Sequence, residues 1–381
     1  MTRSEPASRP IPAPHPSTAP SPRSAPRWFP DGRPAASTPR RYSPLLDLIR
    51  ILAVIAVIAV HVTADHLDSG STVAMHVLRS LLSTAVPAFI MISGALNLAP
   101  AAMRHGSGRF LGRRLRRLIP ATLVWTAFYA GVMRILLADE PPDWRQEAAD
   151  LLTASTYPHL YFLPLILGLT VITPVITAYV GESGRRAWIC GAVAAGWTLV
   201  VMAVPPLTQG LLREPLVPLQ MGILTYFLPF IGYYVLGRAA WAAPVHRRTA
   251  LVMLLVGVPV LTAATVWAYL SRTTDTPPGQ VLLPTYVAPT VMLLSLALVV
   301  GLMGLGRRWT VTARTERLLR TVGDATFGVF LVHFAILVGL RELGYPEVSV
   351  LTVTGLLVLV TLGAFVVSLL GKKIPGLRAI L

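Results

Sequence analysis

The segment 45–65 limits what this chain can fold into, because ionisable side chains flank an apolar run of ten residues. A transmembrane helix needs about 20 residues, so the run alone cannot cross a bilayer. A spanning helix that begins early takes in Asp47 and Arg50. One that ends late takes in His61 and Asp65, and a long one takes in all four. Ionisable residues at membrane depth are costly and usually mark a functional cavity, relay or ion path.

The spacing of these residues places them on one helix face. Arg50 and His61 lie eleven residues apart, which at about 100° per residue returns them to within about 20° of each other. Asp47 and Asp65 fall near the same stripe. Asp65 is also at i+4 from His61, where a carboxylate can orient the imidazole as a base for a hydroxyl proton. The alternative is a hydrogen-bonded packing histidine.

The composition predicts an all-α polytopic membrane protein. Hydrophobic residues make up 54% of the chain and charged residues only 13%, far from the averages of soluble domains. Hydropathy predicts a bundle of about ten transmembrane helices. They fall near 45–65, 76–99, 117–137, 159–180, 187–204, 222–240, 249–270, 283–305, 325–341 and 349–371.

The positive charge is distributed by loop. Arginine and lysine concentrate in the tail before the first span, in alternate loops and after the last span, and they are scarcer in the intervening loops. This pattern predicts a multi-pass protein of the cell membrane with both termini cytoplasmic. The net charge of +16 is then explained by orientation and by anionic membrane lipids, so we expect no nucleic-acid partner.

Residues 1–44 form a separate region, rich in proline, serine and arginine and almost free of aliphatic residues. Such a segment cannot bury enough surface to fold, so we expect a disordered cytoplasmic tail. No apolar stretch of a signal peptide follows its arginines. The transmembrane domain then covers 45–371, and 372–381 is a short basic cytoplasmic C-terminus. The single cysteine, Cys190, excludes an internal disulfide, and we expect no metal.

A cluster of arginines precedes the third span. Arg114 and Arg117 lie three residues apart on one helix face, and two guanidinium groups so placed can hold phosphate oxygens. Arg113 lies beside them. The alternative is that any cytoplasmic loop of such a protein is rich in arginine.

Two further segments carry polar or aromatic residues into the membrane. His159 and Tyr161 enter the fourth span, and His333 lies inside the ninth. Aromatic residues at such a depth are usually interfacial anchors, with an acceptor-binding role as the alternative. The stretch 93–97 is small and polar, which is typical of close helix packing.

Taken together, these motifs resemble the membrane-bound acyltransferase family 3, over about residues 43–371. The stretch around His159 is most similar to the surface-polysaccharide O-acetyltransferase branch. The motifs that carry the resemblance are 46–50 followed by His61, 89–94, the arginine-rich run 109–120, 159–174 and 326–333.

The resemblance implies transfer of an acyl group, commonly acetyl from acetyl-CoA, to a hydroxyl of a glycan or another exported acceptor. Arg50 and His61 match the family's paired arginine and histidine. Arg114 and Arg117 match its RxxR element and would hold the phosphates of CoA. The chain departs from the family at Ala95-Leu96, where a bulky aromatic is frequent, and at Phe334, where proline usually follows the histidine.

A mechanism follows from this assignment. Eleven helical residues span about 16 Å, so an acyl-CoA held at Arg114 and Arg117 could extend its pantetheine arm along the polar stripe to His61. His61 would act as general base, oriented by Asp65, or would form an acyl-histidine. Arg50 would line the tunnel or stabilise charge on the thioester side.

We assign four residues to substrate binding, namely His159, Tyr161, His333 and Asp47. Two other functions stay open. A proton-coupled transporter or exporter also uses intramembrane ionisable residues, although the two halves show no matching broken helices. A sensor or structural partner of a glycan-assembly complex could keep the fold without the chemistry. The sequence gives no indication of the oligomeric state.

Overall fold

The computed structural model describes residues 43–66, 72–136, 143–153, 157–209, 222–276, 278–306 and 309–381. These residues form helices and turns and no strand, which confirms the all-α prediction. The predicted disordered tail, 1–44, lies outside the described residues except for its last two, and the first helix begins at Pro44.

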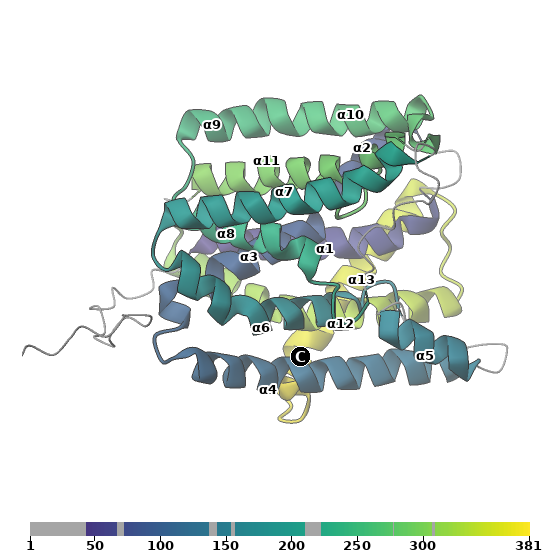
Figure 1. The fold of residues 1–381 in the computed structure, drawn as a ribbon. Coiled ribbons are helices and arrows are strands. Elements are labelled where there is room, and N and C mark those ends of the chain that lie inside the picture. Colours follow the sequence, from purple (N-terminus) through teal and green to yellow (C-terminus); the bar gives the residue numbers. More distant parts are fainter. Residues whose placement is uncertain are drawn as a thin grey trace, which may run out of the picture. The chain divides into compact units, whose positions relative to one another are not determined.

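Long helices lie side by side and run in alternating directions (Figure 1). The first half of the chain contains α1 (Pro44–Val62), α2 (Val73–Leu82), α3 (Ala85–Asn97), α4 (Ser107–Phe128), the π-helical turns Tyr129–Leu136, α5 (Trp144–Thr153), α6 (Phe162–Val180) and α7 (Gly184–Thr208). The second half contains α8 (Ile231–Ala242), α9 (Arg247–Val252), the π-helical turn Met253–Gly257, α10 (Val258–Leu270), α11 (Pro289–Gly306), α12 (Ala313–Glu342) and α13 (Val350–Gly371). Short 3-10 turns include Ala64–His66 and Leu377–Ala379.

Eight of these helical segments are long and apolar enough to cross a membrane. Two of the eight join consecutive elements, α2 with α3 and α9 with α10. The other two predicted spans, near 117–137 and 222–240, correspond to α4 and α8. The first turns of α4 are rich in arginine, and α8 is only 12 residues long. The eight segments support the predicted multi-pass architecture. The count of ten transmembrane helices stays a prediction.

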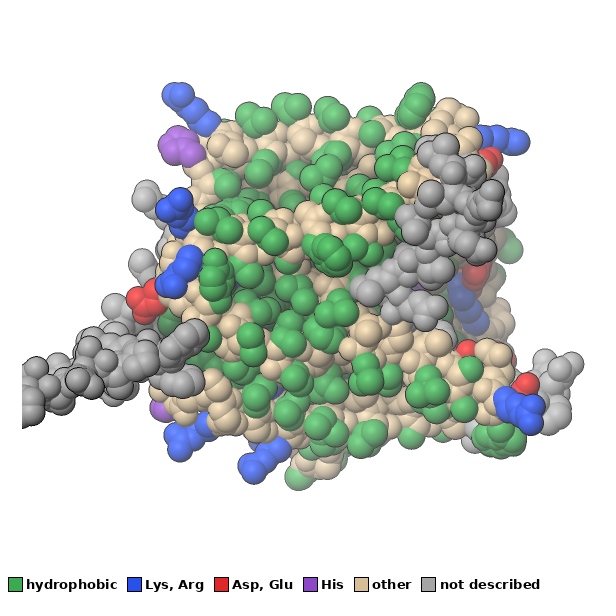
Figure 2. Space-filling view, viewed as in Figure 1, with side chains coloured by type: hydrophobic (Ala, Val, Ile, Leu, Met, Phe, Trp, Pro, Cys, Tyr) green, Lys and Arg blue, Asp and Glu red, His purple; other side chains and the backbone are tan. Residues whose placement is uncertain are grey.

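The apolar surface agrees with a lipid environment. Large hydrophobic side chains are exposed along the middle of the helices, for example Val175 at 73%, Trp197 at 68% and Leu255 at 71%. Figure 2 shows such side chains spread across the centre of this face, with charged side chains at its left and right edges. A soluble protein rarely exposes so much contiguous apolar surface.

Small residues allow the central helices to approach closely. The helix α3 packs on α1 and α8, α8 also packs on α7, and α12 packs between α1 and α13. A Cβ atom at Gly94 of α3 would lie 1.7 Å from the main-chain oxygen of Tyr234 in α8. A Cβ atom at Gly237 of α8 would lie 1.9 Å from the main-chain oxygen of Met91 in α3. Direct backbone contact of this kind is a typical use of glycine in membrane bundles.

Candidate active site

A cavity of about 970 Å³ opens where α1, α4 and α12 begin and where α3 and α13 end. We call this end of the bundle the basic end, because six cations and one carboxylate line the cavity. The cations are Arg50, Arg114, Arg117, Lys372, Lys373 and Arg378, and the carboxylate is Asp324. The site is strongly positive, which favours an anionic ligand.

The predicted arginines come together in this cavity. Arg114 donates a hydrogen bond to the side-chain oxygen of Asn97 at the end of α3. The guanidinium of Arg117 lies 5.3 Å from the centre of the Phe327 ring, in cation–π contact. Arg50 forms an ion pair with Asp47 at 3.2 Å. Arg113 is exposed and does not line the cavity.

Lys372 follows the last turn of α13 and is half-buried in the same cavity. Its ammonium donates a hydrogen bond to the main-chain oxygen of Asp324. Burial and then the positive charge of Arg117 lower the pKa of Lys372, against the opposing effect of the Asp324 carboxylate and with a smaller contribution from Arg50. The contribution of Arg117 is that of a like charge close by, which a bound anion would offset.

Phenylalanine side chains line the inner part of the cavity. Phe89, Phe162 and Phe330 belong to three different helices, and the rings of Phe162 and Phe330 lie 4.8 Å apart between their centres. Phe330 also contacts the rings of His159 and His333, each at 5.8 Å. One aromatic layer therefore separates the cavity from a group of histidines.

Three histidines that lie far apart in the sequence form one cluster. The ring centre of His61 lies 5.5 Å from that of His333 and 6.2 Å from that of His159. The rings of His159 and His333 lie 5.2 Å apart. Among the described residues, no group of three or more histidine, cysteine or acidic side chains could hold a metal ion.

Two of these histidines are buried with unpaired ring nitrogens. The Nδ1 atom of His333 lies 2.7 Å from the main-chain oxygen of Phe330, but its Nε2 atom has no hydrogen-bond partner among the described residues. Both ring nitrogens of His159 are buried and lack a partner in the same part of the chain. Leaving buried polar atoms unpaired is costly, and such atoms beside a candidate base can bind a substrate.

Phe334 fills the position at which the resembled family usually has proline. Its ring stacks on His159 at 5.1 Å with an interplanar angle of 13°, and it meets the ring of His61 edge-on at 5.1 Å. This departure from the family therefore changes the wall of the histidine cluster itself.

Asp65 lies beyond the end of α1 and forms its ion pair with a residue other than His61. The helix α1 ends at Val62, and the hydroxyl of Thr63 bonds back to the main-chain oxygen of Ala59 at 2.6 Å. The helical i+4 geometry is therefore lost between His61 and Asp65. The Asp65 carboxylate instead forms an ion pair with Arg341 at 3.1 Å.

The remaining predicted residues, Asp47 and Tyr161, have their contacts outside the cluster. Asp47 is at the basic end with Arg50, far along α1 from His61. Tyr161 is close in sequence to His159, and its ring stacks on Tyr226 with 5.0 Å between their centres.

Sequence reasoning missed Tyr129, which begins the π-helical turns after α4. Its hydroxyl donates a hydrogen bond of 2.7 Å to the Leu331 carbonyl and accepts one of 3.1 Å from the Ala335 amide. In a regular helix these two groups would bond to each other, so the tyrosine inserts into α12 at His333. The only sequence signal is an aromatic stretch at 125–129, which looks like an ordinary interfacial belt.

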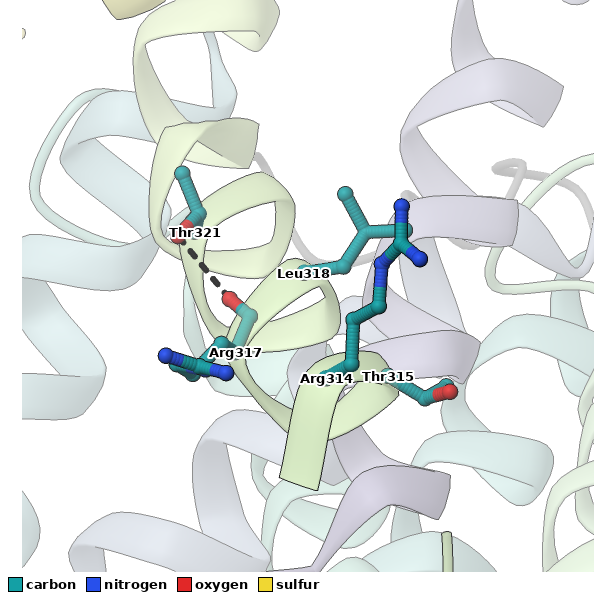
Figure 3. Close-up of a pocket in the computed structure, with 5 residues that line it drawn as sticks. All are labelled: Arg314, Thr315, Arg317, Leu318 and Thr321. Atoms are coloured by element: carbon teal, nitrogen blue, oxygen red, sulfur yellow. Dashed lines mark hydrogen bonds between the residues drawn. The ribbon is translucent and has the colours of Figure 1, made fainter. Parts of the chain in front are cut away.

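A smaller hollow of about 460 Å³ lies on the first turns of α12 (Figure 3). All five of its lining residues belong to this one helix, and the side chains of Arg314 and Arg317 point to different sides of it. A single helix face does not enclose a ligand, so this hollow is not a candidate binding site.

Comparison with known proteins identifies the chain at the level of family. The family model described as an acyltransferase domain matches residues 44–369 of the 381. No curated protein and no solved structure matches the chain. The match covers the histidine cluster and the helices around the cavity up to residue 369 in α13, and it stops before Lys372, Lys373 and Arg378. The protein is thus a multi-pass membrane acyltransferase that belongs to the membrane-bound acyltransferase family 3.

Proposed function

We propose that this protein is an integral membrane O-acyltransferase that moves an acyl group, acetyl in the simplest case, from cytoplasmic acyl-CoA to a hydroxyl of a glycan or another exported acceptor. One observation carries the proposal. A single cavity connects a set of six cations to Phe330, and Phe330 contacts two of the three clustered histidines.

The cavity suits a CoA thioester in charge and in polarity. Its entrance offers cations for phosphate groups, which bind arginine through charge-assisted hydrogen bonds. Its inner part offers apolar side chains such as Phe89, Phe162 and Ile166 for the pantetheine arm. The volume of about 970 Å³ lies at the upper end of the range for small-molecule sites. The basic end would face the cytoplasm, where acyl-CoA is made.

His61 is the group best placed to act as general base. In the proposed reaction it takes the proton of the acceptor hydroxyl, and the oxygen attacks the thioester carbonyl. A C–O bond forms and the C–S bond breaks. CoA then leaves as the thiolate, while the proton stays on His61. The unpaired nitrogens of His159 and His333 can then hydrogen-bond the acceptor or the oxyanion.

Asp65 has a different role in this scheme from the one its spacing suggested. Its ion pair with Arg341 connects the end of α1 to α12, and α12 carries His333. We therefore assign Asp65 to holding the two helices together, and Phe330 to controlling access of the thioester to the histidines.

Equilibrium binding of acetyl-CoA to purified protein in detergent tests the donor site. We expect saturable binding that weakens by more than about tenfold in an Arg114→Ala/Arg117→Ala variant, because each side chain offers charge-assisted hydrogen bonds. The control is Arg247→Ala/Arg248→Ala, which removes the same charge at α9, on the opposite side of the bundle from α4 (Figure 1). If the folded wild-type protein binds no acetyl-CoA at millimolar concentration, the donor assignment is wrong.

A second measurement tests the chemistry. His61→Ala should bind acetyl-CoA as the wild type does, and it should lose about 10²- to 10⁴-fold in acyl transfer, the usual contribution of a general base. Transfer is followed as release of free CoA from protein in liposomes. A variant that folds and keeps full activity would refute the role of His61. An acetyl group found covalently on His61 by mass spectrometry would favour the acyl-histidine route.

A further inference from the structure

The segment 372–381 turns back onto the bundle after α13. Leu381 is only 3% exposed. The indole of Trp125 donates a hydrogen bond of 3.1 Å to the main-chain oxygen of Ile380, and Arg117 donates one of 3.3 Å to that of Leu381. The segment is therefore tied to α4 through Trp125 and through Arg117, one of the two arginines that the sequence assigned to CoA.

Two glycines make room for this contact. A Cβ atom at Gly371 would lie 2.3 Å from the Leu381 side chain, and one at Gly328 of α12 would lie 3.3 Å from the Cβ atom of Leu381. The segment thus has a defined seat between α4, α12 and α13, and it carries three cations into the cavity.

The three cations of the segment are Lys372, Lys373 and Arg378, and all three line the cavity. Lys372 is held by the main-chain oxygen of Asp324. Lys373 and Arg378 are exposed, and neither is in an ion pair with a described residue. Their charges are available to a ligand at the entrance.

The cavity thus holds two groups of cations on different elements. Arg50 comes from α1, and Arg114 and Arg117 come from α4, whereas the other three come from the 372–381 segment. A CoA thioester also carries phosphate in two places, the pyrophosphate that joins pantetheine to the nucleotide and the separate 3′-phosphate on the ribose. Each group of anions can therefore be held by cations from a different part of the chain.

We propose that the 372–381 segment binds the 3′-phosphate of the acyl-CoA through Lys373 and Arg378, while Arg114 and Arg117 hold the pyrophosphate. This inference rests on the proposed function and adds a source of donor specificity. The enzyme should distinguish CoA thioesters from otherwise identical thioesters that lack the 3′-phosphate.

The test compares two probes, acetyl-CoA and acetyl-3′-dephospho-CoA, by equilibrium binding to the full-length protein in detergent. We expect the wild type to bind acetyl-CoA about tenfold to hundredfold more tightly than the dephospho probe. The dephospho probe lacks the charge-assisted hydrogen bonds of the 3′-phosphate. The Lys373→Ala/Arg378→Ala variant should bind the two probes about equally, because its affinity for acetyl-CoA drops and its affinity for acetyl-3′-dephospho-CoA does not. Arg114→Ala, which leaves the contact between Arg117 and the segment in place, should weaken both probes and keep the preference.

Two further variants control for charge and folding. Lys373→Arg/Arg378→Lys keeps both charges and should keep the preference, and Arg247→Ala/Arg248→Ala should leave both affinities unchanged. A wild type that binds both probes equally, or a preference that survives in Lys373→Ala/Arg378→Ala, would overturn the inference and leave the proposed function intact. Failure of the wild type to bind either probe would overturn both.

Discussion

The contact between α3 and α8 gives a sharp prediction, because a single methyl group at Gly94 cannot be accommodated. Its Cβ atom would lie 1.7 Å from the main-chain oxygen of Tyr234, and real Cβ atoms essentially never approach within 3.0 Å. The obstructing atom belongs to the backbone of a buried helix and cannot rotate away. Gly94→Ala must therefore push the two helices apart by at least about 1 Å in a region packed like a crystal.

The cost follows from what the displacement disturbs. Overpacking a core costs about 1–3 kcal/mol, and we expect the upper end of that range here because a whole helix must move. The hydroxyl of Tyr234 lies 2.8 Å from that of Thr173 in α6, so the hydrogen bond between these helices is strained as well. Asn97 follows Gly94 by one helical turn and bonds to Arg114, so affinity for acetyl-CoA should also fall.

Thermal unfolding of the purified protein in one detergent measures the effect. The matched control is Gly196→Ala in α7, where a Cβ atom would meet nothing within 4 Å. An alanine there should be neutral or should stabilise the helix by up to about 1 kcal/mol. If Gly94→Ala unfolds at the same temperature as the wild type and as Gly196→Ala, the α3–α8 packing described above is wrong.

Three other changes test the site. Burial and Arg117 lower the pKa of Lys372, and an anionic ligand needs its charged form, so acetyl-CoA affinity should fall as pH rises through that lowered pKa. Lys372→Arg should keep its affinity at the same high pH, which a binding titration over pH checks. Tyr129→Phe removes the hydroxyl inserted beside His333. The Tyr129→Phe variant should lose about 1–3 kcal/mol of stability. Its acyl transfer, followed as release of free CoA, should be slower although it binds acetyl-CoA as tightly as the wild type. An unchanged transfer rate would exclude a positioning role for Tyr129. Arg341→Ala breaks two partly exposed ion pairs, so unfolding measurements should show a loss of only about 1 kcal/mol.

Hydropathy predicted most of the fold because the bilayer imposes a length on apolar helices. Hydropathy says less about transmembrane helices that carry polar functional residues. The arginines of its first turns keep α4 out of the segments that composition marks as able to cross a membrane, and α8 is too short. The two spans that stay predictions therefore differ in their cause, since charge excludes α4 and length excludes α8.

Sequence spacing works within one helix and fails where the helix ends. It placed Arg50 and His61 on one side of α1, and the structure puts Arg50 at the cavity and His61 in the histidine cluster. It failed for Asp65, because α1 ends at Val62 before the i+4 position is reached. The contacts of His61 with His159 and His333 depend on how α1, the start of α6 and α12 pack, and no periodicity of a single segment reports that.

The 372–381 segment shows the same limit from the side of charge. A count of lysines and arginines after the last span predicts a basic tail, and it cannot distinguish a tail in solvent from one that is seated in a cavity. What seats this segment is apolar: the Leu381 side chain packs against Gly328 of α12 and Gly371 of α13. These two glycines are 43 residues apart. They form one binding site for the Leu381 side chain only after α12 and α13 have packed. The packing of these two helices therefore determines where the cations of the segment lie, and through them the charge at the cavity entrance.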